Sequence, residues 1–183
     1  MIWPISLLTS FSKICEKVIY KRLINHTSAH NILSKAQYGF RTNMSTDNAV
    51  YQLMNNILKA LDNKQLVGGM FCDLSKAFDC VDHETLLSKL EYYGVRGTAN
   101  KLIKSYLVDR FQRVLIKDSY SGIHHSEWSK VKRGGPQGSI LGPLFFLFYI
   151  NDLPEIIRYI PTNSFCWRYK YRLCPENPRR THE

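Results

Sequence analysis

The longest apolar stretch of the chain, residues 140–150, constrains the fold more than any other feature. Gly142 and Pro143 interrupt it, and it is shorter than the roughly 20 residues that span a bilayer. Its length favours a helix over a strand. With 44% hydrophobic and 22% charged residues, the 183-residue chain can form a buried core and is not wholly disordered. We expect one domain of ordinary size or a compact pair of lobes.

The charge balance indicates a polyanionic partner. A net charge of +10 favours nucleic acid first and a membrane surface second, although an ordinary basic soluble protein fits the charge equally well. The N-terminus lacks a basic segment and carries Pro4 in its apolar stretch, so we expect no signal peptide. The five cysteines show no CxxC pair, which argues against a disulfide framework or zinc site. We therefore expect an intracellular protein, in the cytoplasm or nucleus, without a membrane partner.

Hydrophobic spacing and turn residues predict an α+β chain. Helices are expected over 9–23, from Ser45 or Thr46 to about 61, over 83–91 with Asp82 as its cap, and over 99–109. Residues 66–72 resemble a short buried strand, and 111–116 and parts of 120–133 resemble two strands joined near 119–122. Residues 25–44 are polar and rich in turn formers.

The first segment that can carry chemistry is 66–79. A carboxylate after a buried strand is a common way to hold Mg²⁺, so Asp73 is the best candidate ligand, with the Leu74 carbonyl beside it. Ala77 and Phe78 would then place a small residue and a flat ring near the ion, where the ring can pack against a sugar. The plainer interpretation makes Asp79 and Asp82 turn and cap residues and gives Asp73 no metal.

The second such segment is the glycine-rich turn at 133–143. Gly134, Gly135 and Gly138 allow backbone conformations that other residues avoid, so the chain can approach a nucleotide closely. Gln137 offers a hydrogen-bond donor and an acceptor at the tip. The alternative is an ordinary loop before a helix.

Taken together, these segments resemble the reverse transcriptases of non-LTR retrotransposons of the LINE or jockey type. FCDLSKAFDCVDHETLLSKL (71–90) is similar to their motif A, and RGGPQGSILGPLFFLFYINDLP (133–154) is similar to motif B. PISLLTSFSKICEKVIYKRL (4–23) and QYGFRTNMSTDNAV (37–50) resemble two finger-side motifs that precede motif A. The segments occur in the family's order and cover residues 4 to about 160.

The resemblance implies a right-hand polymerase with a fingers-like part (1–65) and a partial palm (66–160), in which helices back an antiparallel sheet. It implies synthesis of DNA on an RNA template from a DNA primer and deoxynucleoside triphosphates, with two Mg²⁺ ions. The resemblance also implies roles for single residues. Asp73, which is catalytic, and the Leu74 carbonyl would be the metal ligands. The nucleotide-binding residues would be Ala77, Phe78, Gln137 and Gly138, with Phe78 excluding the ribose 2′-hydroxyl, and the template, primer or finger contacts would be Arg41, Arg133 and Pro136.

The sequence departs from the family after motif B. The family has Phe-Ala-Asp-Asp in its motif C, whereas residues 155–183 contain no Asp. Read one base later, suitable codons for residues 163–169 give Ile-Leu-Phe-Ala-Gly-Asp-Thr, which indicates a frameshift near Thr162. Residues 161–183 are then an aberrant, disordered basic tail.

Two further departures concern the ends of the chain. Trp3 stands where the family usually has Arg, and we expect neither a thumb nor an endonuclease domain. These departures predict an inactive fragment. The alternative is a non-catalytic or domesticated remnant that binds RNA or DNA.

Overall fold

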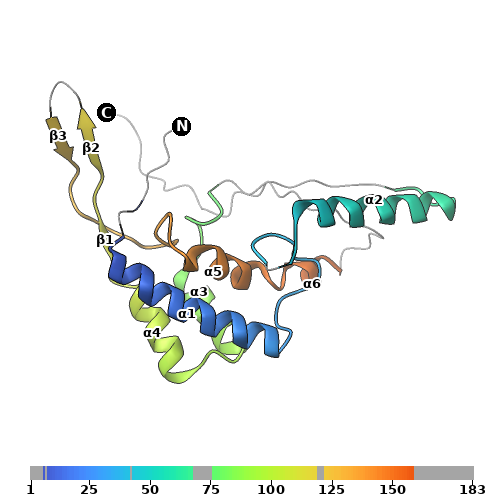
Figure 1. The fold of residues 1–183 in the computed structure, drawn as a ribbon, viewed down its shortest axis with the longest axis horizontal. Helices are drawn as coiled ribbons and strands as arrows, with labels where there is room; N and C mark the ends of the chain where they lie inside the picture. Colours follow the sequence, from blue (N-terminus) through green and yellow to red (C-terminus); the bar gives the residue numbers. More distant parts are fainter. Residues whose placement is uncertain (1–5, 7, 42, 68–75, 119–121, 159–183) are drawn as a thin grey trace.

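The computed structural model describes residues 6, 8–41, 43–67, 76–118 and 122–158, and the following account concerns these residues. A bundle of helices forms the centre of the molecule, with a hairpin and one long helix extending from it (Figure 1). Asp73, Leu74 and the tail at 161–183 lie outside the described residues, as does the segment expected to carry motif C.

The predicted helix in the apolar stretch is confirmed and lies at the centre of the core. α5 (Leu141–Ile150) contacts both α3 (His83–Tyr92) and α1 (Ser10–Ala29), and α3 also contacts α4 (Gly97–Leu107). Because neighbours surround α5, residues from most of its circumference are buried: Leu141, Leu144, Phe145, Phe146, Leu147 and Phe148. An almost wholly apolar helix is stable in this position because little of it meets water.

α1 is longer than its sequence predicted. Thr9 caps it, its side-chain oxygen accepting a hydrogen bond from the Ser12 backbone, and the helix continues beyond residue 23 to Ala29. Two contacts support the added turns: the buried Thr27 hydroxyl donates to the Leu23 carbonyl at 2.6 Å, and His26 Nε2 lies 2.9 Å from the Tyr93 carbonyl. The carbonyl in the second contact belongs to Tyr93 at the end of α3, so the spacing of apolar residues within 9–29 does not reveal this contact.

α2 (Thr46–Asp62) begins where it was predicted, with Ser45 as its cap. It extends away from the bundle (Figure 1) and contains no buried residue. Its apolar side chains Val50, Met54, Leu58 and Leu61 are therefore exposed.

The two predicted strands near the 119–122 turn are confirmed as an antiparallel hairpin in two parts. β2 (Leu115–Asp118) pairs with β3 (Gly122–His125), and β1 (Phe111–Gln112) pairs with β4 (Ser129–Lys130). The strand predicted at 66–72 is not seen in its described part, where residues 66 and 67 are exposed coil. Helices with small antiparallel sheets confirm the α+β class.

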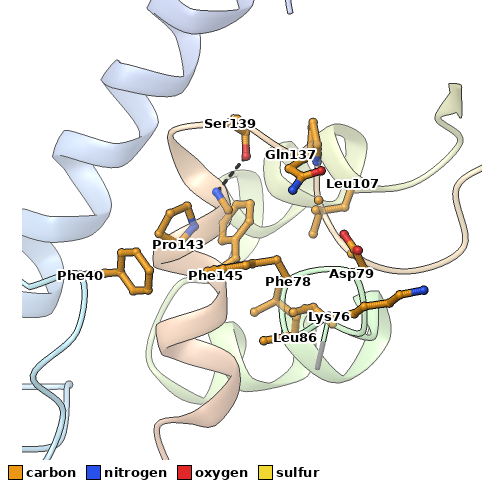
Figure 2. A pocket seen from close by; sticks show the side chains of 17 residues that line it. Phe40, Lys76, Phe78, Asp79, Leu86, Leu107, Gln137, Ser139, Pro143 and Phe145 are labelled. Atoms are coloured by element: carbon orange, nitrogen blue, oxygen red, sulfur yellow. Dashed lines mark hydrogen bonds between the residues drawn. The ribbon is translucent and has the colours of Figure 1, made fainter. Parts of the chain in front are cut away.

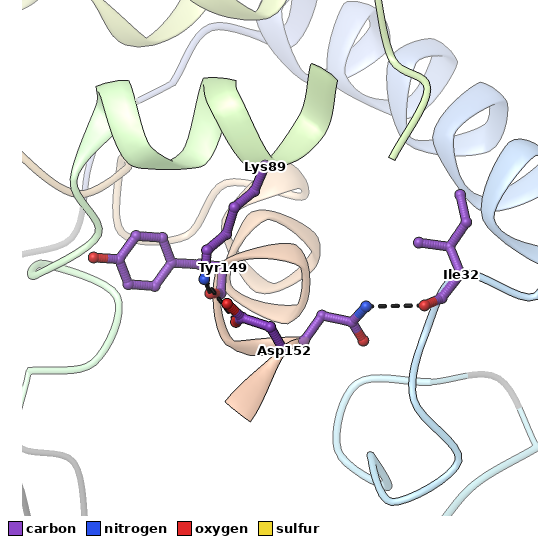
Figure 3. Close-up of polar contacts among 5 residues, drawn as sticks. Ile32, Lys89, Tyr149 and Asp152 are labelled. Atoms are coloured by element: carbon purple, nitrogen blue, oxygen red, sulfur yellow. Dashed lines mark hydrogen bonds and ion pairs between the residues drawn. The ribbon is translucent and has the colours of Figure 1, made fainter. Parts of the chain in front are cut away.

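Polar contacts close the far end of the bundle, where α6 (Leu153–Arg158) follows α5. Lys89 Nζ donates to the Tyr149 carbonyl and pairs with Asp152 Oδ1, each at 2.6 Å (Figure 3). The buried Asn151 side chain donates to the Ile32 carbonyl and accepts from the Ser34 backbone. These bonds fix the segment after α1 against the end of α5.

No helix of the described residues is long and apolar enough to cross a membrane. Cys80 is buried and disulfide-bonded, a bond that the sequence argument against a disulfide framework did not predict.

Candidate functional site

Two turns that lie far apart in the sequence face each other across a cavity of about 440 Å³. One turn is residues 76–79, shortly before α3, and the other is the motif B loop, residues 133–140, directly before α5. Figure 2 shows Phe40 at one side of this cavity and Lys76 and Asp79 at the other. The cavity is also lined by Ala77, Phe78, Val81, Leu86, Leu107, Gly134, Gly135, Pro136, Gln137, Gly138, Ser139, Gly142, Pro143 and Phe145.

The first turn presents the Phe78 ring to the cavity. The Asp79 and Cys80 backbone amides both donate to the Lys76 carbonyl, which closes the turn. Phe78 is 38% exposed, and its ring contacts the rings of Phe40 and Phe146 at centroid distances of 5.7 and 5.1 Å. Because Phe40 and Phe146 come from other segments of the chain, these contacts restrict the ring while Phe78 stays part of the cavity lining.

The start of the motif B loop is fixed against the first turn through Gly134. Its backbone amide donates to the Val81 carbonyl at 2.8 Å, and its own carbonyl accepts from Nε2 of the buried His83 at 2.7 Å. Gly134 has φ +73°, and a Cβ there would lie 2.7 Å from the Asp79 Cα. Only glycine permits this close approach of the two turns.

The tip of the loop carries Gln137 and Gly138. Gly138 has φ +91°, and the Gln137 carbonyl accepts from the Ser6 backbone at 3.1 Å. Ser139 closes the turn by donating its amide to the Pro136 carbonyl at 3.0 Å. The half-buried Gln137 thus lies at the cavity wall on a fixed backbone.

The end of the loop is held by a buried carboxylate from α1. Glu16 is 1% exposed, and its Oε2 accepts from the Ile140 backbone amide at 2.7 Å. Its Oε1 accepts from the Tyr106 hydroxyl, also at 2.7 Å. Burial, and then the neighbouring Glu16 carboxylate, raise the pKa of Tyr106. The Tyr106 hydroxyl therefore stays protonated and donates at any ordinary pH.

The structure brings five of the predicted site residues together around the cavity: Ala77, Phe78, Pro136, Gln137 and Gly138. Arg41 and Arg133 do not line it. The Arg41 guanidinium donates to the Ser34 and Gln37 carbonyls at 2.7 and 3.2 Å, within its own loop. Arg133 Nε lies 3.9 Å from the Asp82 carboxylate, beside the bridge that pairs these two residues.

Sequence reasoning did not single out Phe40 or Lys76, which also line the cavity. Phe40 lies within the 37–50 segment that resembled a finger-side motif, so that resemblance held the signal. Asp82 is the α3 cap, as predicted, and accepts from the Thr85 amide at 2.9 Å. Asp79 lies in a turn, as predicted, but it also contributes the carboxylate of the cavity lining.

The chemistry of the cavity suits a flat ligand with a polar end. Its walls are mainly apolar side chains and glycine backbone, and Lys76 and Asp79 are its charged residues. Within the described ranges no three His, Cys, Asp or Glu side chains converge to hold a metal ion. The described residues therefore do not form a metal site by themselves, and the predicted ligand Asp73 lies outside them.

Comparison with known proteins identifies the family. Residues 2–170 match the reverse transcriptase (RNA-dependent DNA polymerase) family. The chain is 41% identical over 158 residues to the "Probable RNA-directed DNA polymerase from transposon BS" of Drosophila melanogaster, and 34% identical over 151 residues to the "RNA-directed DNA polymerase from mobile element jockey" of the same organism. Each match covers 82% of this chain and 16% of the relative, so the chain spans about a sixth of those proteins. The predicted resemblance is thus confirmed, and the chain belongs to the reverse transcriptase family.

Proposed function

We propose that this chain carries the nucleotide- and template-contacting part of an RNA-directed DNA polymerase from a transposable element. Its fingers-like part would comprise 1–65 and its partial palm 66–160. The observation that carries the proposal is the cavity, in which the end of motif A and the motif B loop meet. A family match over 2–170 supports the same assignment.

The cavity suits a deoxynucleotide paired with a template base. A volume of about 440 Å³ lies within the ordinary range of small-molecule sites. We assign Ala77 and Phe78 to the sugar and Gln137 and Gly138 to the nascent base pair. The Phe78 ring is packed against Phe40 and Phe146, so it cannot turn aside easily for an added 2′-hydroxyl. Pro136 would support the loop that faces the template.

Nucleotidyl transfer in this family would require Mg²⁺, which stabilises the charge on the attacking and leaving oxygens. We assign Asp73, with the Leu74 carbonyl beside it, to hold the two ions. This assignment rests on the match of residues 71–79 to motif A. Among the described residues that line the cavity, Asp79 is the one that carries a carboxylate.

We further propose that this chain alone does not extend primers at a measurable rate. Residues 155–183 contain no Asp, so a second metal carboxylate is missing where motif C is expected. RNA or DNA binding without catalysis is the alternative function. Such binding is favoured by the net charge of +10 and by three exposed lysines on one side of α1, Lys13, Lys17 and Lys21. We expect the polymerase and the binding remnant alike to act inside the cell.

Primer extension on an RNA template, with Mg²⁺ and an Asp73→Ala control, tests both parts. We expect salt-dependent binding of the RNA–DNA hybrid, and no extension above the Asp73→Ala background. Extension that disappears in Asp73→Ala would contradict the proposed inactivity and support the polymerase assignment. If the folded original chain binds neither the RNA–DNA hybrid nor a nucleotide, the proposed function itself is contradicted.

A further inference from the structure

We propose that Glu16 is a positioning residue of the nucleotide site, although it belongs to α1 and does not line the cavity. Through the Ile140 amide, its buried carboxylate would set the place of Gln137 and Gly138 at the cavity wall. This inference rests on the proposed function for one point, that the ligand of the cavity is a nucleotide. Whether Glu16 fixes the loop can be tested without knowing the ligand.

The surroundings of Glu16 are unusual for a carboxylate. Burying an ionised carboxylate is costly unless it is paired or fully hydrogen-bonded. Glu16 is 1% exposed, and among the described residues no ion pair includes it. Both of its oxygens instead accept hydrogen bonds at 2.7 Å, one from the Tyr106 hydroxyl and one from the Ile140 amide. Because both oxygens have donors, these two hydrogen bonds offset the cost of burying the side chain.

The Ile140 amide is a specific target because it opens α5. The first amides of a helix have no partner within the helix, and a negative charge is favourable at that end. Ile140 stands at the N-cap position of α5, and its own side chain makes no capping bond. Ser139 Oγ accepts a hydrogen bond from the Gly142 amide, and Glu16 accepts one from the Ile140 amide. A side chain from another helix therefore completes this cap.

The two ends of the motif B loop are thus fixed by separate buried side chains. His83 holds the Gly134 carbonyl at the beginning, and Glu16 holds the Ile140 amide at the end. The intervening residues include Gly135 and Gly138, whose backbone is costly to order without such anchors. If the anchor at Ile140 is removed, we expect Gln137 and Gly138 to sample positions that no longer match a bound nucleotide.

Three variants separate positioning from simple packing. Glu16→Gln keeps the shape, because its carbonyl oxygen can accept from Ile140 and its amide can donate to the Tyr106 oxygen. Glu16→Met keeps the length and removes every acceptor. Tyr106→Phe removes one donor to Glu16 and leaves the Ile140 bond. Cys15→Ser, at an exposed neighbouring position, is the matched control.

The measurements are amide hydrogen exchange of the whole chain, urea unfolding, and binding of dCTP with Mg²⁺ to a complex with an RNA template and a dideoxy-terminated primer. In Glu16→Met we expect about tenfold faster exchange at residues 137–142, beyond any change in α3 and α4. We also expect about tenfold weaker dCTP binding. Glu16→Gln should restore both properties to within about threefold of the original chain, and Tyr106→Phe should keep the loop protected.

The outcomes distinguish this inference from the proposed function. If exchange in Glu16→Met rises equally in α3, α4 and the loop, Glu16 only stabilises the fold and the inference is overturned. Equal loss in Glu16→Gln and Glu16→Met would overturn it as well. If the original chain binds no dCTP, the proposed function fails, while exchange at residues 137–142 still decides whether Glu16 holds the loop.

Discussion

Gly134 is the residue at which the two turns of the cavity approach most closely. It has φ +73°, and a Cβ would lie 2.7 Å from the Asp79 Cα and 2.8 Å from the Phe78 carbonyl oxygen. Backbone strain and overpacking together predict that Gly134→Ala lowers the free energy of unfolding by about 3 kcal/mol. Gly135→Ala, where nothing lies within 4 Å of the added Cβ, should change it little. Urea unfolding measures both, and equal losses would contradict the described contact.

Phe78 is the residue to which we assign sugar discrimination. Its ring contacts the rings of Phe40 and Phe146, so a smaller side chain should open space beside them. For Phe78→Val we expect the preference for dCTP over CTP to fall by about tenfold, with dCTP affinity within about threefold of the original. Competition binding to the primer–template complex measures the ratio. An unchanged preference would remove Phe78 from this role.

Asp82 predicts a pH dependence of stability. The hydrogen bond from the Thr85 amide lowers the pKa of Asp82, against an opposing effect of burial. A lowered pKa in the folded state means that the ionised cap stabilises the fold above the usual carboxyl range. This contribution is lost as the pH falls through the folded-state pKa.

The corresponding variant is Asp82→Ala. We expect it to lower the free energy of unfolding by about 1 kcal/mol near neutral pH. The difference from the original chain should shrink as the pH falls below the usual carboxyl range and through the lowered folded-state pKa of Asp82. Asp82→Asn keeps the cap and serves as the control at neutral pH. A difference that grows on acidification in urea unfolding would refute this account.

At the scale of elements, α5 and α2 both carry several apolar side chains, but α5 is packed among other helices and α2 has no buried residue. Leu147 in α5 is fully buried, whereas Leu58 in α2 is 55% exposed. Leu147→Ala should therefore lower the free energy of unfolding by about 3 kcal/mol, because it leaves a cavity in the core. Leu58→Ala should cost less than about 0.5 kcal/mol. Similar losses in urea unfolding would mean that α2 packs against the bundle in solution.

Several elements could be predicted from local sequence because their causes are local. The length of the apolar stretch indicated α5, and the capping residues Ser45 and Asp82 marked the starts of α2 and α3. The end of α1 could not be predicted, since His26 is held by the Tyr93 carbonyl, 67 residues away. Long-range contacts of this kind leave no periodicity in the sequence.

In the candidate site too, residues within recognisable motifs could be predicted, and residues placed by long-range contacts could not. Phe78, Gln137 and Gly138 were predicted through motifs whose chemistry is visible in the sequence, and all line the cavity. Glu16 was not predicted, because one acidic residue in a basic helix gives no local sign of burial. Arg41 and Arg133 lie outside the lining because neighbouring carbonyl groups and the Asp82 carboxylate already hold their guanidinium groups.

At the scale of the whole molecule, α1 and the segment after it share one core with α3, α4 and α5. Leu23 of α1 and Leu33 after it belong to the same buried cluster as residues of α3, α4 and α5. The hydrogen bonds that the Glu16 carboxylate accepts from the Tyr106 hydroxyl and the Ile140 amide also join α1 to α4 and to the start of α5. The cavity is therefore built on a core to which α1 contributes, and we expect the N-terminal helix to be needed for it.

The central claim is that the cavity between residues 76–79 and the motif B loop binds the incoming nucleotide. The most direct test is to follow the backbone amide NMR signals of the isotopically labelled chain while dCTP is added to its complex with Mg²⁺, an RNA template and a dideoxy-terminated primer. We predict saturable shifts at 76–79, 134, 135 and 137–139 and none in α2. The absence of saturable shifts in the folded complex, or shifts confined to another surface, would contradict the claim.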